Sequence, residues 1–188
     1  MGSPRPLTVS VRPQRIMHVA PLSASDAQRY RELMLHAYAA AADAFTSTPE
    51  ERAAEPESWW VSRIADAKGL SQAFGAFHNG ELVGTVTIEF AAKPKTKHKA
   101  HLIGMFVSEA ARGLGAGRAL VNAALAAARA RPGVLVVTLT VTEGNLPAIA
   151  LYESCGFNTF GTEPMAIATP GGFKSKVHMW HGLAQAAA

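Results

Sequence analysis

Three glycines spaced two residues apart point most directly to chemistry. Gly113, Gly115 and Gly117 are flanked by Arg112 and Arg118. Glycines let the backbone fold so that successive N–H groups face one point. The helix expected to follow adds its own unpaired N–H groups and positive dipole end. Such a concavity suits an anion, and the two arginines are placed to add charge-assisted hydrogen bonds to a pyrophosphate. A tight strand-to-helix turn that binds no ligand is the alternative interpretation.

Two other kinds of phosphate loop differ from this segment. A P-loop ends in Gly-Lys followed by Ser or Thr, whereas Gly117 is followed by arginine and alanine. The P-loop interpretation therefore fails. The dinucleotide fingerprint G-x-G-x-x-G lies directly after its strand, but the spacing here is G-x-G-x-G and a long stretch separates Val107 from Gly113. A dinucleotide-binding enzyme stays open as an alternative, because the acidic Glu143 follows the next expected strand.

Two segments, in order along the chain, resemble the hallmarks of one known family. The segment Val107-Ser-Glu-Ala-Ala-Arg-Gly-Leu-Gly-Ala-Gly117 resembles the R/Q-x-x-G-x-G/A signature of the GNAT superfamily of N-acetyltransferases. Downstream, Asn145-Leu-Pro-Ala-Ile-Ala-Leu-Tyr-Glu-Ser-Cys-Gly-Phe157 resembles the N-x-x-A-x-x-x-Y-x-x-x-G-F helix of the same superfamily. These specific motifs lie between His101 and Phe157. The order of the expected elements extends the resemblance over residues 15–183.

The resemblance implies acetyl-CoA as co-substrate and no metal. The loop amides would bind the CoA pyrophosphate. The strand before the loop would pair with the pantetheine arm, with an amide of Phe106 or Val107 on the thioester oxygen. Asn145 would hydrogen-bond the pantetheine, and Ala148 would be small enough to let it approach. The implied cofactor-binding residues are Met105, Phe106, Val107, Arg112, Gly113, Leu114, Gly115, Ala116, Gly117, Arg118, Asn145, Ala148 and Tyr152.

Tyr152 is the candidate general acid. It follows Asn145 by seven residues, about two helical turns, so both side chains project from nearly the same helix face. By resemblance, Tyr152 protonates the departing CoA thiolate, and its hydroxyl has an unperturbed pKa of about 10. A packed core aromatic is the alternative interpretation.

Glu89 is the candidate base. An acceptor amine must lose a proton before it attacks, because an alkyl ammonium with a pKa of about 10 is protonated at neutral pH. In related enzymes the same strand often carries a carboxylate that accepts this proton directly or through water. The parity of Glu89 matches Thr85 and Thr87 rather than the apolar Val86 and Ile88. That parity suits a solvent-facing glutamate equally well.

Other reactive or aromatic residues have a structural interpretation beside a functional one. Trp59 and Trp60 either line the acceptor side or fill the core. Cys155 lacks an identifiable base and is expected to be a buried, inert thiol. His98 and His101 lie among lysines with no third ligand in view, so no metal site is predicted.

The expected elements form one alternating arrangement of strands and helices. Capping signals at Ser25 with Gln28 and at Thr48 with Glu51 open the first two helices, and an Asn-Gly pair joins two apolar runs as a hairpin. This order predicts an α+β fold with a GNAT-like mixed, largely antiparallel sheet flanked by helices in three layers (α/β/α). Strands are expected at 15–20, 71–78, 81–90, 100–107, 134–141, 157–161, 165–168 and 176–183, and helices at 25–38, 48–69, 118–130 and 145–156.

Length and composition indicate one domain. The 188 residues are 48% hydrophobic, enough for a single core, and no apolar run approaches the ~20 residues of a membrane span. Residues 1–14 are expected to be a disordered lead-in, 15–183 the N-acetyltransferase domain and 184–188 a tail. The single cysteine fits a cytoplasmic location, and a net charge of +4 without a basic tail argues against a nucleic-acid partner. The alternating lysines at 93–99 would line one face of an extended strand at a solvated hairpin end.

Three functions are compatible with these residues. The first is acetyl transfer by direct attack of a small-molecule primary amine such as a polyamine, amino acid or antibiotic. The second uses a protein or peptide amine, as ribosomal-protein-acetylating relatives do. The third is a non-catalytic module that binds acetyl-CoA, against which the presence of Asn145 and Tyr152 argues. A homodimer built on sheet edges, common in the superfamily, is a further expectation.

Overall fold

Seven strands form a single mixed sheet, and its order is β1-β2-β3-β4-β5-β7-β6. The structure is a computed structural model that describes residues 17–183. The expected lead-in at 1–14 and tail at 184–188 lie outside the described residues. Within this sheet β4 and β5 are parallel and the other neighbours are antiparallel. The strands are Met17–Pro21 (β1), Ser71–His78 (β2), Glu81–Phe90 (β3), Lys99–Val107 (β4), Val136–Thr142 (β5), Asn158–Thr169 (β6) and Gly172–Gly182 (β7).

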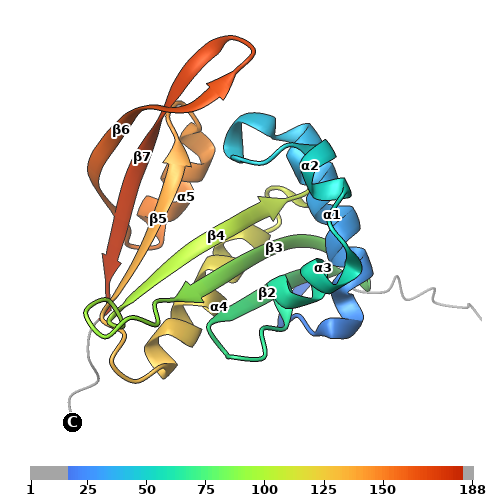
Figure 1. The fold of residues 1–188 in the computed structure, drawn as a ribbon, viewed down its shortest axis with the longest axis horizontal. Helices are drawn as coiled ribbons and strands as arrows, with labels where there is room; N and C mark the ends of the chain where they lie inside the picture. The colour runs from blue at the N-terminus through green and yellow to red at the C-terminus, as the bar shows by residue number, and fades with distance from the viewer. Residues whose placement is uncertain (1–16, 184–188) are drawn as a thin grey trace, which may run out of the picture.

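Helices cover both faces of the sheet and divide the core in two (Figure 1). One cluster of buried side chains joins α4 and α5 to strands β2–β5 and β7, and the other joins α1 and α3 to β2 and β4. The expected three-layer α+β fold is therefore confirmed. The helices are Ala27–Ala40 (α1), Pro49–Ala53 (α2), Glu57–Ile64 (α3), Ala116–Ala130 (α4) and Leu146–Ser154 (α5), with short 3-10 turns at Ala24–Asp26, Ala42–Ala44 and Glu109–Ala111.

The sheet splits between β4 and β5, which pair over only three residues of β4. The register of β4 against β3 shifts between Thr85 and Thr87, where β4 holds one extra residue near Gly104, a bulge that bends the strand. Its pairing with β5 ends at His101 opposite Thr138, and the two strands then diverge (Figure 1). The edge of β4 that faces β5 is consequently unpaired with β5 from Leu102 onward.

The β2–β3 hairpin has the expected bounds, and both residues of its Asn-Gly turn have positive φ. The helices before it differ from expectation. The first capping box joins Ser23 and Asp26, since Ser23 N–H donates to Asp26 Oδ2 over 2.8 Å, so the predicted Ser25–Gln28 pair was wrong. The single helix predicted over 48–69 is instead two helices, α2 and α3, and the second of them ends at Ile64. Pro56 explains the break, because proline lacks the N–H that a continuous helix needs.

The C-terminal strands and the lysine segment also differ. The expected strands at 157–161 and 165–168 are one strand, β6, interrupted by irregular register around Pro164 and Met165. Proline donates no ladder hydrogen bond, which accounts for the apparent gap in the sequence pattern. The lysine segment at 93–98 forms the turns that join the antiparallel strands β3 and β4, so the expected hairpin end is confirmed. The extended, lysine-lined conformation expected there was wrong, since β4 begins only at Lys99.

Candidate active site

A cavity of about 1030 Å³ lies where β4 and β5 separate. Its walls are the second half of β4, the glycine loop, the start of α5 and, opposite these, the segment from the end of α1 into α2. All but one of the predicted cofactor-binding residues line it; the exception is Leu114, whose side chain is 48% exposed. We call one part the glycine-loop half, made of Met105, Phe106, Val107, Arg112, Gly113, Gly115, Ala116, Gly117, Arg118, Asn145, Ala148 and Tyr152. We call the other part the charged half, made of Tyr38, Arg52, Arg63, Glu89, His101 and Lys176.

Backbone N–H groups are the main polar feature of the glycine loop. Gly113 and Gly115 have φ of 75° and 83°, a conformation that costs other residues free energy. Among the described residues, the N–H groups of Gly113, Leu114 and Gly115 meet no backbone acceptor. The first N–H groups of α4, which begins at Ala116 rather than at the expected Arg118, lack intrahelical partners as at any helix start. This row of donors fits a pyrophosphate.

Gly117 has a different role from the other two loop glycines. It lies inside α4, and a Cβ added there would come 3.0 Å from Leu151 Cδ2 of α5. The absence of a side chain therefore allows α4 and α5 to pack closely beside the cavity. Spacing alone could not separate this packing role from the turn-forming role of Gly113 and Gly115.

The two arginines that flank the glycines already have protein partners. Arg112 Nη2 donates to Glu109 Oε1 over 3.3 Å, and Glu109 Oε2 also meets His36 over 3.1 Å. Arg118 Nη1 donates to the carbonyl of Ser154 at the end of α5 over 3.3 Å. Both side chains line the cavity, and these contacts hold their guanidinium groups at its edge.

Helix α5 positions Asn145 and Tyr152. Asn145 is the N-cap, as expected, and its Oδ1 accepts from Ala148 N–H over 3.3 Å. Tyr152 packs edge-to-face on Phe157 with ring centroids 5.9 Å apart, and it is only 5% exposed. Burial raises the pKa of the Tyr152 hydroxyl, with Cys155 adding to the rise. Tyr152 is therefore compatible with both interpretations, a packed core aromatic and a general acid. Its ring belongs to the core cluster, and the residue also lines the cavity.

Glu89 lies opposite His101 in the β3–β4 register, and both line the charged half. Glu89 Oε1 lies 3.5 Å from Arg63 Nη1, and its side chain is 42% exposed. The His101 ring nitrogen Nδ1 hydrogen-bonds Thr138 Oγ1 over 2.9 Å. Burial lowers the pKa of His101, while Glu89 acts in the opposite direction. The geometry brings Glu89 to the cavity and adds a histidine that the sequence pattern had not placed there.

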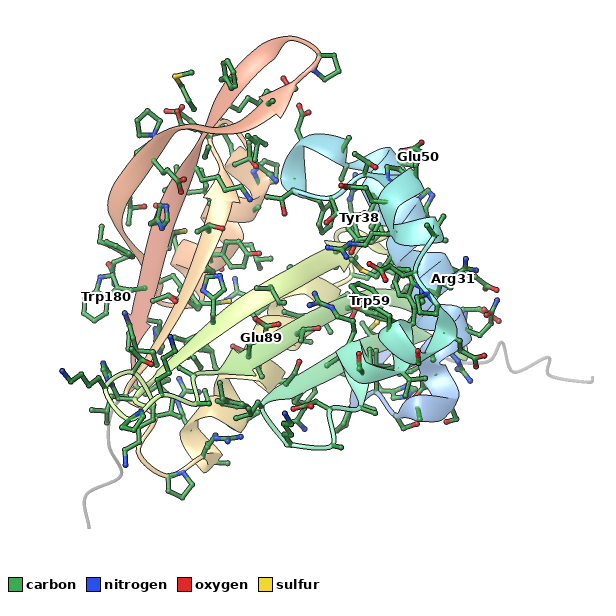
Figure 2. All side chains as sticks on the ribbon, in the orientation of Figure 1. Arg31, Tyr38, Glu50, Trp59, Glu89 and Trp180 are labelled. Carbon is green, nitrogen blue, oxygen red and sulfur yellow. The ribbon has the colours of Figure 1, made fainter. Side chains whose placement is uncertain are left out.

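Two arginines from separate helices stack on one tryptophan. The guanidinium carbons of Arg52 and Arg63 lie 4.6 and 5.3 Å from the ring centroid of Trp59. Trp59 thus packs against both arginines but does not itself line the cavity. Trp60 is 1% exposed and fills the α1–α3 core. In Figure 2, Tyr38 and Trp59 are labelled beside the helices, and Glu89 is labelled on the strands.

Several residues that the sequence singled out lie away from the cavity lining. Glu143 and Cys155 do not line it, and Cys155 is a free, half-buried thiol just after α5. His98 lies in the turn before β4. Over residues 17–183, no group of three His, Cys, Asp or Glu side chains is arranged to hold a metal ion. In the same part of the chain, no helix is long and apolar enough to cross a membrane.

Solved acetyltransferase structures share this fold. The yncA protein of Salmonella typhimurium, solved with its cofactor acetyl-CoA, has a TM-score of 0.75 at 21% identity and covers 92% of this chain and 97% of its own. The ribosomal-protein-alanine N-acetyltransferase of Brucella melitensis has a TM-score of 0.72 at 24% identity and covers 88% and 99%. The fold is that of the GNAT acetyltransferases, as the two sequence motifs implied.

Residues 32–157 match the Acetyltransferase (GNAT) family, and the chain belongs to this family of N-acetyltransferases. The L-amino acid N-acetyltransferase AaaT of Escherichia coli (strain K12) is 31% identical over 103 residues, which are 55% of this chain and 62% of that protein. The mycothiol acetyltransferase of Thermomonospora curvata is 33% identical over 135 residues, which are 68% of this chain and 41% of that protein. The chain thus matches less than two thirds of the length of either curated relative.

Proposed function

We propose that the protein transfers an acetyl group from acetyl-CoA to a small-molecule primary amine by direct attack of the amine on the thioester. The observation that carries this proposal is the division of one cavity into two unlike halves. Unpaired amides and a helix start lie in one half, and a carboxylate, a histidine and cations lie in the other. Two substrates of different chemistry would meet between them.

The glycine-loop half fits coenzyme A. The N–H groups from Gly113 to Arg118 would hold the pyrophosphate, and the free edge of β4 at residues 105–107 would pair with the pantetheine arm. Asn145 Oδ1 is used by the helix cap, so its Nδ2 group is the part that would donate to the pantetheine. Ala148, one turn into α5, would leave space for the arm to approach.

The charged half supplies the proton acceptor. Glu89 would take the proton of the acceptor ammonium directly or through water, which frees the nitrogen lone pair. The nitrogen then bonds to the thioester carbon while the carbon–sulfur bond breaks. The leaving sulfur takes a proton from the Tyr152 hydroxyl, which burial keeps protonated at neutral pH. The nitrogen then loses its second proton, directly or through water, to the Tyr152 oxygen, which restores the hydroxyl. The products are the N-acetylated amine and coenzyme A.

A protein or peptide amine is the second candidate acceptor. It is supported by the likeness to structures named as ribosomal-protein-alanine N-acetyltransferases, at identities that support the fold alone. A non-catalytic acetyl-CoA-binding module is the third candidate, and Tyr152 at the cavity wall argues against it. A cytoplasmic location, a homodimer, and the absence of membrane and nucleic-acid partners stay predictions from the sequence.

The test is thiol release by the purified protein with acetyl-CoA and a panel of amines and peptides, repeated with Tyr152→Phe. We expect kcat to fall about 100-fold in this variant, because a positioned general acid typically contributes that much. Affinity for CoA in calorimetry should stay within about twofold, because the ring and its packing remain.

Thr85→Val is the control. It also removes a buried hydroxyl, which donates to the Phe74 carbonyl over 3.1 Å and lies outside the cavity lining, and it should retain kcat. Undiminished turnover in Tyr152→Phe would remove the acid role from this residue. A protein that does not bind coenzyme A in calorimetry would overturn the whole proposal.

A further inference from the structure

The charged half contains more positive charge than the acetyl-transfer chemistry needs. Arg52, Arg63 and Lys176 line it, and Glu89 is the only carboxylate among the described residues of the whole cavity lining. The pyrophosphate would lie at the glycine loop, where Arg112 and Arg118 also line the cavity. The cations of the charged half therefore lack a role in the proposed binding of CoA.

The guanidinium group of Arg52 has two protein partners, but one of its N–H groups has no hydrogen-bond acceptor among the described residues. Its Nη2 donates to Ser47 Oγ over 2.7 Å, and its Nη1 lies 3.4 Å from Glu55 Oε1. The Nε–H group is buried and has no hydrogen-bond partner. A buried donor without an acceptor costs free energy comparable to a lost hydrogen bond, and here it belongs to a side chain that lines the cavity.

Arg63 holds a second guanidinium against the same indole ring. Arg52 and Arg63 both stack on Trp59, and both line the charged half, so two positive side chains face the same part of the cavity. Two carboxylates balance part of this charge, Glu89 at 3.5 Å from Arg63 and Glu55 at 3.4 Å from Arg52. Planar guanidinium groups pair well with carboxylates, because their N–H groups match the spacing of the two oxygens.

We propose that Arg52 and Arg63 form a carboxylate subsite, and that the acceptor is a primary amine that also carries a carboxylate, as an α-amino acid does. The carboxylate would lie on the two arginines and the ammonium would point to Glu89. Positive and negative groups lie side by side in Arg63 and Glu89, which complements a molecule whose own opposite charges are one carbon apart. This inference rests on the proposed acetyl transfer and narrows its acceptor.

The first test compares matched acceptors. Acetyl transfer to a panel of L-α-amino acids is measured beside transfer to the corresponding amino acid amides, which keep the amine and side chain but lack the anionic group. The free acids should have a kcat/KM about 10- to 100-fold higher, the typical worth of a charge-assisted hydrogen bond pair. Equal or better use of the amides would overturn the inference while leaving acetyl transfer intact.

The second test removes one guanidinium at a time. Arg52→Gln and Arg63→Gln should each lower kcat/KM for the acid about 10-fold or more and leave that for the amide within about threefold, so that the preference shrinks. Two variants from different helices protect the test if one of them unfolds. Arg29→Gln is the matched control, because Arg29 also lies over an aromatic ring, that of Phe77 at 5.8 Å, but does not line the cavity. An acid preference unchanged in both cavity variants would overturn the inference.

A third measurement separates failure of this inference from failure of the proposed function. The amino acids and amides are titrated by calorimetry into the wild-type protein saturated with coenzyme A. If acetyl-CoA binds and no amine is acetylated, the proposed transfer fails, and binding of the acids but not of the amides still supports the subsite. If neither acids nor amides bind, the subsite is overturned as well.

Discussion

The two halves of the cavity are built from different parts of the polypeptide. The glycine-loop half comes from consecutive elements, β4 to α5, and it would recognise its ligand mainly through backbone N–H groups. The charged half is assembled from side chains on α1, α2, α3, β3, β4 and β7. Backbone recognition requires glycines at fixed positions, which leaves a pattern in the sequence. Side-chain recognition by distant segments leaves none, so the two halves should respond differently to substitution.

The largest expected effect comes from Gly115→Val. Gly115 has φ of 83°, and a β-branched side chain in this conformation is strained by roughly 1–3 kcal/mol. The loop would relax and turn its N–H groups away from their common point. We expect the affinity for coenzyme A, measured by calorimetry, to fall about 100-fold.

Gly133→Val is the control for this substitution. Gly133 follows the other end of α4, has φ of 81°, and like Gly115 has no atom within 4 Å of an added Cβ. The strain is thus similar while the position is remote from the glycine loop. Equal losses of affinity in the two variants would mean that the loop amides have no special role.

The next largest effect tests the charged half. Glu89→Gln keeps the shape of the side chain and removes its charge and basicity. We expect kcat for acetyl transfer to fall about 10-fold, less than for a sole general base, because a carboxylate that is 42% exposed leaves room for water to act as a relay. Affinity for coenzyme A should stay within about twofold.

Glu81→Gln at the exposed start of the same strand is the control and should keep full activity. Unchanged kcat in Glu89→Gln would support the solvent-facing interpretation of Glu89. A large loss of CoA affinity in this variant would contradict the division of the cavity into two halves.

Local signals explain how much of the fold the sequence predicted. The Asn-Gly turn determines where β2 ends and β3 begins. The capping pair Thr48 and Glu51 determines where α2 begins. Other signals were ambiguous because two residues matched the same rule, as Ser23 and Ser25 did for the first capping box. The extent of β6 through Pro164 depends on its pairing with β7 along its length, a long-range property that no local window contains.

The same contrast separates the predicted from the missed site residues. The spacing of the loop glycines and the Asn145–Tyr152 helix is visible within one stretch of chain, and the structure places both at the cavity. Arg52, Arg63 and Lys176 are separated by many residues and meet only after α2, α3 and β7 have packed. The sequence around a basic residue on a short helix does not indicate whether its side chain contacts a ligand or is only exposed to solvent.

A pH effect should also belong to the charged half. Burial lowers the pKa of His101, opposed by the carboxylate of Glu89 and helped by the nearby ammonium of Lys176. The unfolded chain then binds this proton more tightly than the folded protein. The stabilising contribution is therefore complete above a pH of about 6.5 and is lost as the pH falls below that value, by at most about 1.4 kcal/mol per pH unit for one proton.

His101→Gln should flatten this dependence, because the amide can still bond Thr138 Oγ1 but does not titrate. The free energy of unfolding is measured by urea denaturation at a pH of about 7.5 and about 5.5. His18→Gln, an exposed histidine on β1, is the control and should leave the difference between the two conditions unchanged. An identical pH dependence in His101→Gln and the wild type would show that other groups cause it.

The smallest effect tests whether a local capping signal matters for the charged half. Thr48 Oγ1 accepts from Glu51 N–H over 3.2 Å, and Glu51 Oε2 accepts from Thr48 N–H over 2.8 Å. Thr48→Ala removes the first of these bonds and should destabilise α2 by about 1 kcal/mol. Arg52 is the only residue of this short helix that lines the cavity. Fraying of α2 should therefore raise the acceptor KM a few-fold and leave CoA affinity unchanged.

The control for the capping substitution is Thr96→Ala, which also removes a local threonine hydrogen bond, here donated by the hydroxyl to the Lys93 carbonyl in the turn before β4. It should change neither kinetic constant. If Thr48→Ala lowered CoA affinity as much as it raised the acceptor KM, α2 would have to act on both halves. The two halves of the cavity would then not act independently. A helix that contributes only Arg52 to the lining could affect the glycine loop only through a conformational change that both halves share.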